Sequence, residues 1–153
     1  MRLLSQRLAK IPERLLYDAM GEKRMFSTKT GDFMGYIKFH SIGEIKTKNS
    51  ETYKSMYIND IFVVDNYRKQ GVGKSLINLA KIASKERGAN GNLHVVAYSI
   101  DHPGNPPHKF YRKLNFTTGL KEHDDLIDEA IKNNEPIPAI FTQGTTMFYK
   151  HKV

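Results

Sequence analysis

Two glycines and several cations stand between a predicted strand and a predicted helix, an arrangement suited to binding phosphate. The run YINDIFVVDNYRKQGVGKSLINLAKIASKER covers residues 57–87, with Gly71 and Gly73 near its centre. Glycine lets the main chain approach an anion closely, and a helix start presents free N–H groups and positive potential. Lys69 and Lys74 add charge that can screen a phosphate. This stretch therefore predicts an anion-binding site.

Two common phosphate-binding motifs do not fit this spacing. A nucleotide-binding P-loop needs a glycine five residues before the glycine of its GK pair, and that position holds Arg68. The dinucleotide motif GxGxxG would need a third glycine where this chain has Leu76. We therefore expect neither nucleotide hydrolysis nor a Rossmann site.

The composition is that of one ordinary globular domain. At 153 residues, with 39% hydrophobic and 26% charged residues, the chain suits a single core, so we expect one domain over residues 1–153. The absence of Cys excludes thiolate nucleophiles and Cys-ligated zinc, and the six His lack paired spacing, so no metal site is predicted. No apolar run is long enough to cross a bilayer and the N-terminus lacks a secretory pattern, so we expect a cytoplasmic protein without a membrane segment.

Hydrophobic periodicity predicts an α/β chain. We expect two short helices within residues 3–20, a hairpin about the Gly-Asp turn at 31–32, and a surface loop over 43–52. A buried strand at 53–64, a helix at 72–87 and a strand at 93–98 imply a parallel right-handed crossover. The remaining predicted elements are a helix at 108–114, the start of a strand at 116–119, a helix at 124–134 and a strand at 145–152.

The spacing of Arg68, Gly71 and Gly73 in RKQGVG resembles the acetyl-CoA loop of the GNAT superfamily of N-acetyltransferases, which reads (Q/R)xxGx(G/A). Downstream, YSIDHPGNPPHKFYRKLNF at 98–116 resembles that family's later strand, loop and FY-bearing helix. The resemblance implies a mixed α/β (α+β) fold, with a mostly antiparallel twisted sheet, helices on both faces and a splayed, parallel central strand pair. The family usually begins with a strand whereas this chain begins in a helix, so we expect its first strand to be missing or supplied differently.

For the cofactor, the resemblance implies that acetyl-CoA lies between the two splayed strands. Main-chain groups of Phe62, Val63 and Val64 are then expected to pair with the pantetheine arm, as an added strand would. Asn105 is expected to touch the cofactor, and the pyrophosphate to lie on the turn and helix start. The residues expected there are Arg68, Lys69, Gln70, Gly71, Val72, Gly73, Lys74 and Ser75.

For catalysis, the resemblance implies direct attack of an amine on the thioester, without an acyl-enzyme. Tyr111, in FYRKLNF, matches the family's general acid, which protonates the departing thiolate. The amine must also lose a proton, and Asp60 is the candidate base. Related polyamine acetyltransferases carry a Glu-Asp pair where this chain has Asn59 and Asp60, so a water chain stays open as the alternative.

The expected acceptor is an amine on a small molecule or a protein. Residues 121–135 carry a net charge of −4, which either attracts a cationic amine or is the solvated face of a helix. The whole chain has a net charge of +8, but no nucleic-acid-binding motif accompanies it, so we disfavour that partner. A catalytically silent domain that senses acyl-CoA is a further alternative, and an unpaired sheet edge would favour a homodimer.

Overall fold

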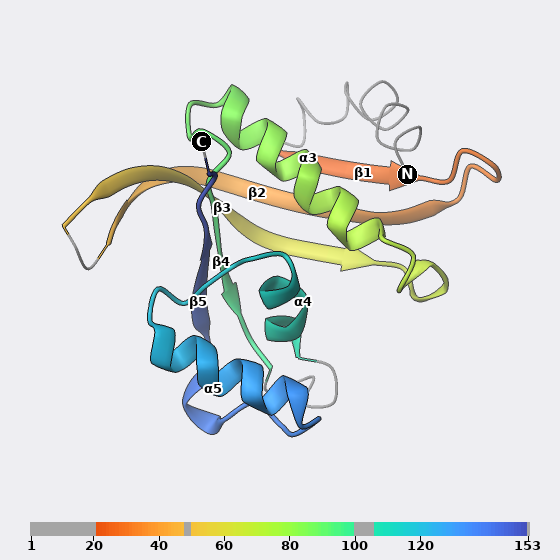
Figure 1. Cartoon of the computed structure of the whole chain (residues 1–153). Helices are drawn as coiled ribbons and strands as arrows, with labels where there is room; N and C mark the ends of the chain where they lie inside the picture. The colour runs from red at the N-terminus through yellow and green to blue at the C-terminus, as the bar shows by residue number, and fades with distance from the viewer. Residues whose placement is uncertain (1–20, 48–49, 100–105, 153) are drawn as a thin grey trace.

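The strands form a five-stranded sheet in which neighbours in the chain are neighbours in space (Figure 1). The computed structural model describes residues 21–47, 50–99 and 106–152, so the predicted N-terminal helices and Asn105 lie outside the described residues. The strands are β1 (Glu22–Phe26), β2 (Phe33–Lys46), β3 (Thr52–Val63), β4 (Leu93–Ala97) and β5 (Thr145–Tyr149).

The strand directions confirm the predicted mixed sheet. Antiparallel pairing joins β1 to β2, β2 to β3, and β4 to β5, whereas β3 and β4 run parallel at the centre. The parallel pair arises because helix α3 (Val72–Glu86) carries the chain from the end of β3 back to the start of β4. The Gly-Asp turn closes the β1–β2 hairpin, as the sequence predicts.

Helix α3 lies across one face of β1, β2 and β3 (Figure 1). It forms where predicted because its apolar residues recur at helical spacing and cover a single stripe. That stripe packs on the inward-facing residues of the sheet, and each fully buried side chain contributes roughly 1.5–3 kcal/mol. The buried helix residues are Val72, Leu76, Ile77, Leu79, Ala80 and Ala83, and their main sheet partners are Met25, Ile37, Met56, Ile58 and Leu93.

The C-terminal part adds helices α4 (Pro107–Lys113) and α5 (Lys121–Lys132), which contact each other near β4 and β5 (Figure 1). Arg112 joins them, because its Nε and Nη2 each lie 2.8 Å from a carboxylate oxygen of Asp128. Its Nη1 donates to the carbonyl of Phe116 at 2.8 Å, so all sides of the guanidinium are used within the fold. Short 3-10 turns follow β3 (Asp65–Tyr67) and precede β5 (Ala139–Phe141).

Two predicted segments differ in the structure. The predicted loop at 43–52 is shorter, because β2 continues to Lys46 and β3 begins at Thr52; the polar residues there pair across the strands, as Glu44 does with Lys54. The predicted strand at 116–119 is only a bridge between Thr117 and Phe148. Asp124 of α5 holds this segment instead, since its Oδ1 accepts a hydrogen bond from the Thr118 amide at 2.8 Å.

Candidate functional site

The parallel strands β3 and β4 pair only over a short stretch and then part. Their paired residues are Met56 with Leu93, Tyr57 with His94, and Ile58 with Val95. Farther along β3, the amide of Val64 donates to the carbonyl of Met34 at 2.8 Å, and Val63 and Ile61 lie opposite Gly35 and Ile37 of β2. Because backbone groups alternate in direction along a strand, those of Ile61 and Val63 point to the side from which β4 has departed.

A β-bulge places Asp60 beside this divergence. Lys38 of β2 faces Asp60 while the next residue, Phe39, faces Ile58, so Asn59 is the extra residue in β3. The bulge changes the alternation of side chains, leaving Ile58 buried against α3 and Asp60 exposed on the opposite face. Asn59 therefore shapes the strand, and Asp60 is the carboxylate that the strand presents.

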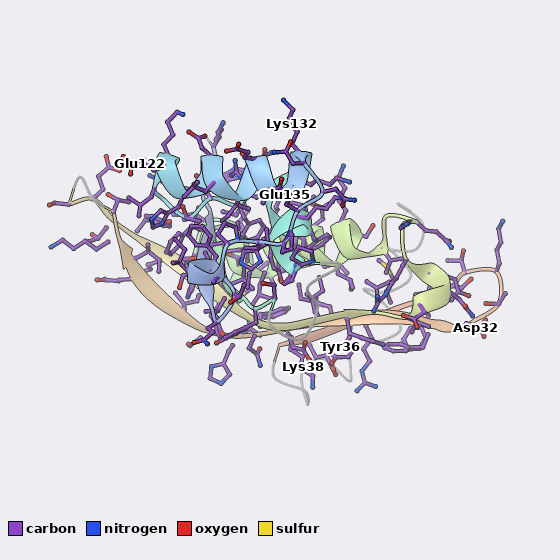
Figure 2. The ribbon with its side chains drawn as sticks, turned by 90° about the horizontal axis from the view of Figure 1, so that it is seen from below. Asp32, Tyr36, Lys38, Glu122, Lys132 and Glu135 are labelled. Atoms are coloured by element: carbon purple, nitrogen blue, oxygen red, sulfur yellow. The ribbon has the colours of Figure 1, made fainter. Side chains whose placement is uncertain are left out.

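A phenol holds Asp60 in place. The Tyr36 hydroxyl donates a hydrogen bond of 2.6 Å to Oδ2 of Asp60, and this bond, followed by burial, raises the pKa of Tyr36 to about 12. Nζ of Lys38 lies 5.1 Å from the centroid of the Tyr36 ring, and Figure 2 shows both side chains on the side of the sheet away from the helices. Sequence analysis missed Tyr36, since its bond to Asp60 joins residues 24 positions apart and depends on the pairing of β2 with β3.

The start of α3 presents backbone N–H groups that are unbonded within the part of the chain that the structure describes. Gly71 is its N-cap, with a left-handed φ of 81° and no side-chain cap, and the first turn contains no acidic residue. The Ser75 amide bonds back to Gly71, whereas the amides of Val72, Gly73 and Lys74 have no acceptor among the described residues. The exposed side chains of Lys69 and Lys74 add positive charge to these free N–H groups.

Two other predicted turn residues shape the loop with their side chains. Nε of Arg68 lies 3.3 Å from the carbonyl of Val63 and 3.2 Å from Oδ1 of Asp65, so the guanidinium folds back on the end of β3. Nε2 of Gln70 donates to the carbonyl of Asn66 at 2.9 Å. Ser75 is buried in α3 and lies one turn inside the helix. Arg68 and Gln70 thus brace the turn through their side chains, and Ser75 through its amide bond to Gly71.

Gly73 makes room for the aromatic end of α4. A Cβ at this position would lie 2.9 Å from Cε1 and 3.0 Å from Cζ of Phe110, closer than packed atoms allow. Phe110 in turn lies against the ring of Tyr111, with centroids 5.3 Å apart, and Tyr111 lies 5.2 Å from Phe116. Gly73 thus lets α4 press against the start of α3, a contact that sequence analysis did not foresee.

Tyr111 is almost fully enclosed, with 4% of its surface exposed. Burial, followed by the negative charge of Asp60, raises the pKa of the Tyr111 phenol well above its usual range. The effect of Asp60 shows that the two predicted catalytic residues lie within electrostatic reach, although they come from different elements. A phenol in this setting stays protonated and can donate a hydrogen bond.

The acidic residues of α5 lie away from Tyr36 and Lys38. Asp128 and Asp124 contact Arg112, and Asp125 accepts a bond from Lys121 at 2.6 Å. Figure 2 shows Glu122 and Glu135 on the side of the molecule opposite Tyr36 and Lys38. The structure therefore favours the second of the two interpretations of residues 121–135: the acidic residues form a solvated helix face and are partly paired with neighbouring cations.

Within residues 21–47, 50–99 and 106–152, no group of His, Cys, Asp and Glu is arranged to hold a metal ion. The same residues include no helix that combines the length and the apolar character needed to cross a membrane.

The sequence pattern of the acetyltransferase (GNAT) family matches residues 6–116, so the chain belongs to this family. No curated protein sequence matches it. Among solved structures, it is similar to nourseothricin acetyltransferase, with 23% identity and a TM-score of 0.50 over 83% of this chain; the match spans 62% of that protein's length. It also resembles AtaT complexed with acetyl-methionyl-tRNAfMet (15%, TM-score 0.52) and a tyrosine mutant of KacT (15%, TM-score 0.51), each over 97% of this chain and 82% of the other. These likenesses support the fold.

A buried histidine fixes the start of α4. Nε2 of His108 lies 3.2 Å from the Phe141 carbonyl and 3.1 Å from Oγ1 of Thr145, and burial lowers the pKa of its ring. Burial also lowers the pKa of His94, whose Nδ1 lies 2.8 Å from the Ser55 hydroxyl. Both rings are therefore held in the neutral form in the folded chain.

This arrangement predicts that stability falls in mild acid. Above an ordinary histidine pKa of about 6.5 both states are neutral; below it the unfolded chain takes up protons that the folded chain refuses, so stability falls with pH until the lowered pKa is reached. One histidine can contribute at most about 1.4 kcal/mol per pH unit. The free energy of unfolding is measured in urea at pH 7.5 and 5.5. His108→Gln and His94→Gln should each reduce the amount by which it falls between these two pH values, whereas His40→Gln, at an exposed position, should not. An equal loss in all four proteins would contradict this assignment.

Proposed function

We propose that the chain transfers an acetyl group from acetyl-CoA to a primary amine within a ternary complex. The observation that supports this best is the meeting of three features at one end of the sheet. The uncapped start of α3, the divergence of β3 from β4, and the enclosed phenol of Tyr111 come from separate stretches of chain. The family defines the class of reaction, and these features suggest how this chain performs it.

The start of α3 is proposed to hold the pyrophosphate of acetyl-CoA. The free amides of Val72, Gly73 and Lys74 would donate to its oxygens, and the Lys69 ammonium would balance part of its charge. Arg68, Gln70 and Ser75 would keep the turn in shape.

The edge of β3 is proposed to bind the pantetheine arm. The Val64 amide is already bonded to β2 and Phe62 has the same orientation, so the groups available among the described residues are those of Ile61 and the amide of Val63, whose carbonyl accepts from Arg68. An extended arm with its own amides could pair with them as a strand does. This moves the proposed contact from a three-residue stretch to alternate residues of β3.

Tyr111 and Asp60 are proposed to assist the chemical step. The amine nitrogen attacks the thioester carbonyl, the carbon–sulfur bond breaks, and the sulfur leaves as a thiolate that receives a hydrogen bond and then a proton. Tyr111 would supply that donor, and its raised pKa favours donation concerted with bond breaking over prior ionisation. The amine's proton leaves toward Asp60, directly or through water.

Asp60 is suited to hold the ammonium of the acceptor, which loses a proton before its nitrogen attacks. Oδ2 accepts from Tyr36, while Oδ1 has no partner among the described residues. One carboxylate oxygen is therefore oriented by the protein and the other is open to an acceptor.

The direct test measures thiol release from acetyl-CoA with a panel of amines. Wild-type protein should release CoA in the presence of at least one primary amine, and release should need both substrates. Aminoacyl-tRNA belongs in the panel because AtaT, a similar fold, is described in complex with an acetylated one. Binding of acetyl-CoA without release for any amine would instead favour the silent acyl-CoA sensor.

We further propose that residues 1–153 form one domain and that the outer edge of β1 is a dimerisation surface. Within the described residues β1 pairs only with β2, which leaves one edge of the sheet open. A monomeric mass by light scattering would count against the dimer.

A further inference from the structure

Four aromatic rings follow one another across the face of β1, β2 and β3 that lies opposite α3. Ring centroids are 5.7 Å apart from Phe26 to Phe33, 6.5 Å from Phe33 to Tyr36, and 5.7 Å from Tyr36 to Phe62. We call these four residues the aromatic row. Phe33 and Phe62 keep 36% and 41% of their surface exposed, which is unusual for adjacent large apolar side chains.

A bulge in β2 brings Phe33 and Tyr36 to one face. Met25 faces Gly35 and Phe26 faces Phe33, so Met34 is an extra residue in β2, and it reverses the alternation of side chains there. Tyr36 pairs directly with Phe62 across the strands, so the rings gather on the face opposite α3, on the same side of the sheet as Asp60. Phe26 also packs against the hydrophobic core.

The charged side chains beside the aromatic row leave room for one cationic group of a ligand, at Asp60. Asp60 borders it, and its Oδ1 has no partner within residues 21–47, 50–99 and 106–152, whereas Glu22 is paired with Arg24 at 2.9 Å and Asp32 accepts a bond from Tyr67 at 3.3 Å. Lys38 lies opposite Asp60 in the sheet and over the Tyr36 ring. Its ammonium would repel a second positive charge on a ligand bound there.

We propose that the aromatic row binds an aromatic or extended apolar substituent of a primary monoamine whose amino group is held by Asp60. This inference rests on the proposed function and adds the class of acceptor. A flat or apolar group gains by covering the exposed rings, and one ammonium can pair with the Oδ1 of Asp60. Polyamines and aminoglycosides are disfavoured because their further charges meet apolar rings and Lys38.

The experiment compares 2-phenylethylamine, hexylamine and spermidine as acceptors. Wild-type protein should have the highest kcat/KM for 2-phenylethylamine and the lowest for spermidine. Phe33→Ala and Phe62→Ala should each raise the KM for 2-phenylethylamine roughly tenfold, as truncation of an aromatic anchor does, with the KM for acetyl-CoA unchanged. Leu126→Ala on α5, an equally exposed apolar position, is the matched control and should change neither constant.

A second variant, Lys38→Gln, tests the role of the positive charge. It should raise kcat/KM for spermidine relative to kcat/KM for 2-phenylethylamine. Binding of 2-phenylethylamine is also measured without cofactor by ligand-observed NMR, so the inference is tested even if no turnover occurs. Loss of that NMR signal in Phe33→Ala and Phe62→Ala supports it. A wild-type preference for spermidine, or variants with a lowered Tm but unchanged KM and NMR signal, would overturn it. Failure to bind acetyl-CoA would instead refute the proposed function.

Discussion

Replacing Tyr111 with Phe should lower kcat by roughly 10²-fold to 10³-fold, the usual contribution of a positioned proton donor. The substitution removes only a hydroxyl that makes no hydrogen bond to any described residue, and leaves the ring in its contacts with Phe110 and Phe116. The KM for acetyl-CoA and the Tm should therefore change little. Steady-state kinetics at saturating acetyl-CoA, with thermal unfolding of the same preparations, provide the measurement.

Tyr149→Phe is the matched control for this variant. Tyr149 lies on the other side of Phe116, with ring centroids 5.7 Å apart, and its ring is covered by the Lys81 ammonium at 3.9 Å. Removing its hydroxyl should leave kcat near the wild-type value. If Tyr111→Phe retains full turnover, the hydroxyl is not the proton donor, and solvent must protonate the thiolate.

Replacing Gly73 with Val should abolish measurable acetyl transfer and lower the Tm. Even the first carbon of the new side chain would lie 2.9 Å from the Phe110 ring, and overpacking of this kind typically costs about 1–3 kcal/mol. Displacement of Phe110 would also move the adjacent Tyr111, and the side chain would crowd the free amides at the start of α3. Thermal unfolding and acetyl-CoA binding measure the two consequences separately.

The control for the glycine variant is Gly43→Val in β2. A Cβ at Gly43 meets nothing within 4 Å, and the residue has no positive φ, so the same change in side chain should be tolerated. If Gly73→Val binds acetyl-CoA and turns over as well as Gly43→Val does, the close contact between α3 and α4 is not needed for the site.

The sequence was sufficient for the elements whose patterns are local. The stripe of apolar residues in α3 is visible in the chain, and a strand on each side of that helix implied the parallel pair of β3 and β4. Tyr111 and the start of α3 were found because their motifs are contiguous. Likewise, the Gly-Asp turn marked the first hairpin.

What the sequence could not predict depends on register and on contacts between distant segments. The bond from Tyr36 to Asp60 joins residues 24 positions apart and depends on the pairing register of β2 with β3, which no local pattern in either strand gives. Gly73 was interpreted as a close approach to phosphate alone, but its nearest neighbour is the Phe110 ring from a helix more than thirty residues later. The prediction of a loop over residues 43–52 was wrong in extent, because polar residues at an exposed hairpin can still pair as strands.

Binding of acetyl-CoA is tested most directly by calorimetric titration of the full chain with this cofactor, together with the Tm of the protein measured with and without it. We predict saturable binding at one site per chain. A ligand at 100 times its Kd stabilises the folded state by about 2.7 kcal/mol, and a domain of this size gains roughly 2–4 °C per kcal/mol, so the Tm should rise by roughly 5–10 °C. Because phosphates are held partly by lysines, binding should weaken as salt is raised. No heat of binding and no change in Tm at saturating acetyl-CoA would contradict the central claim.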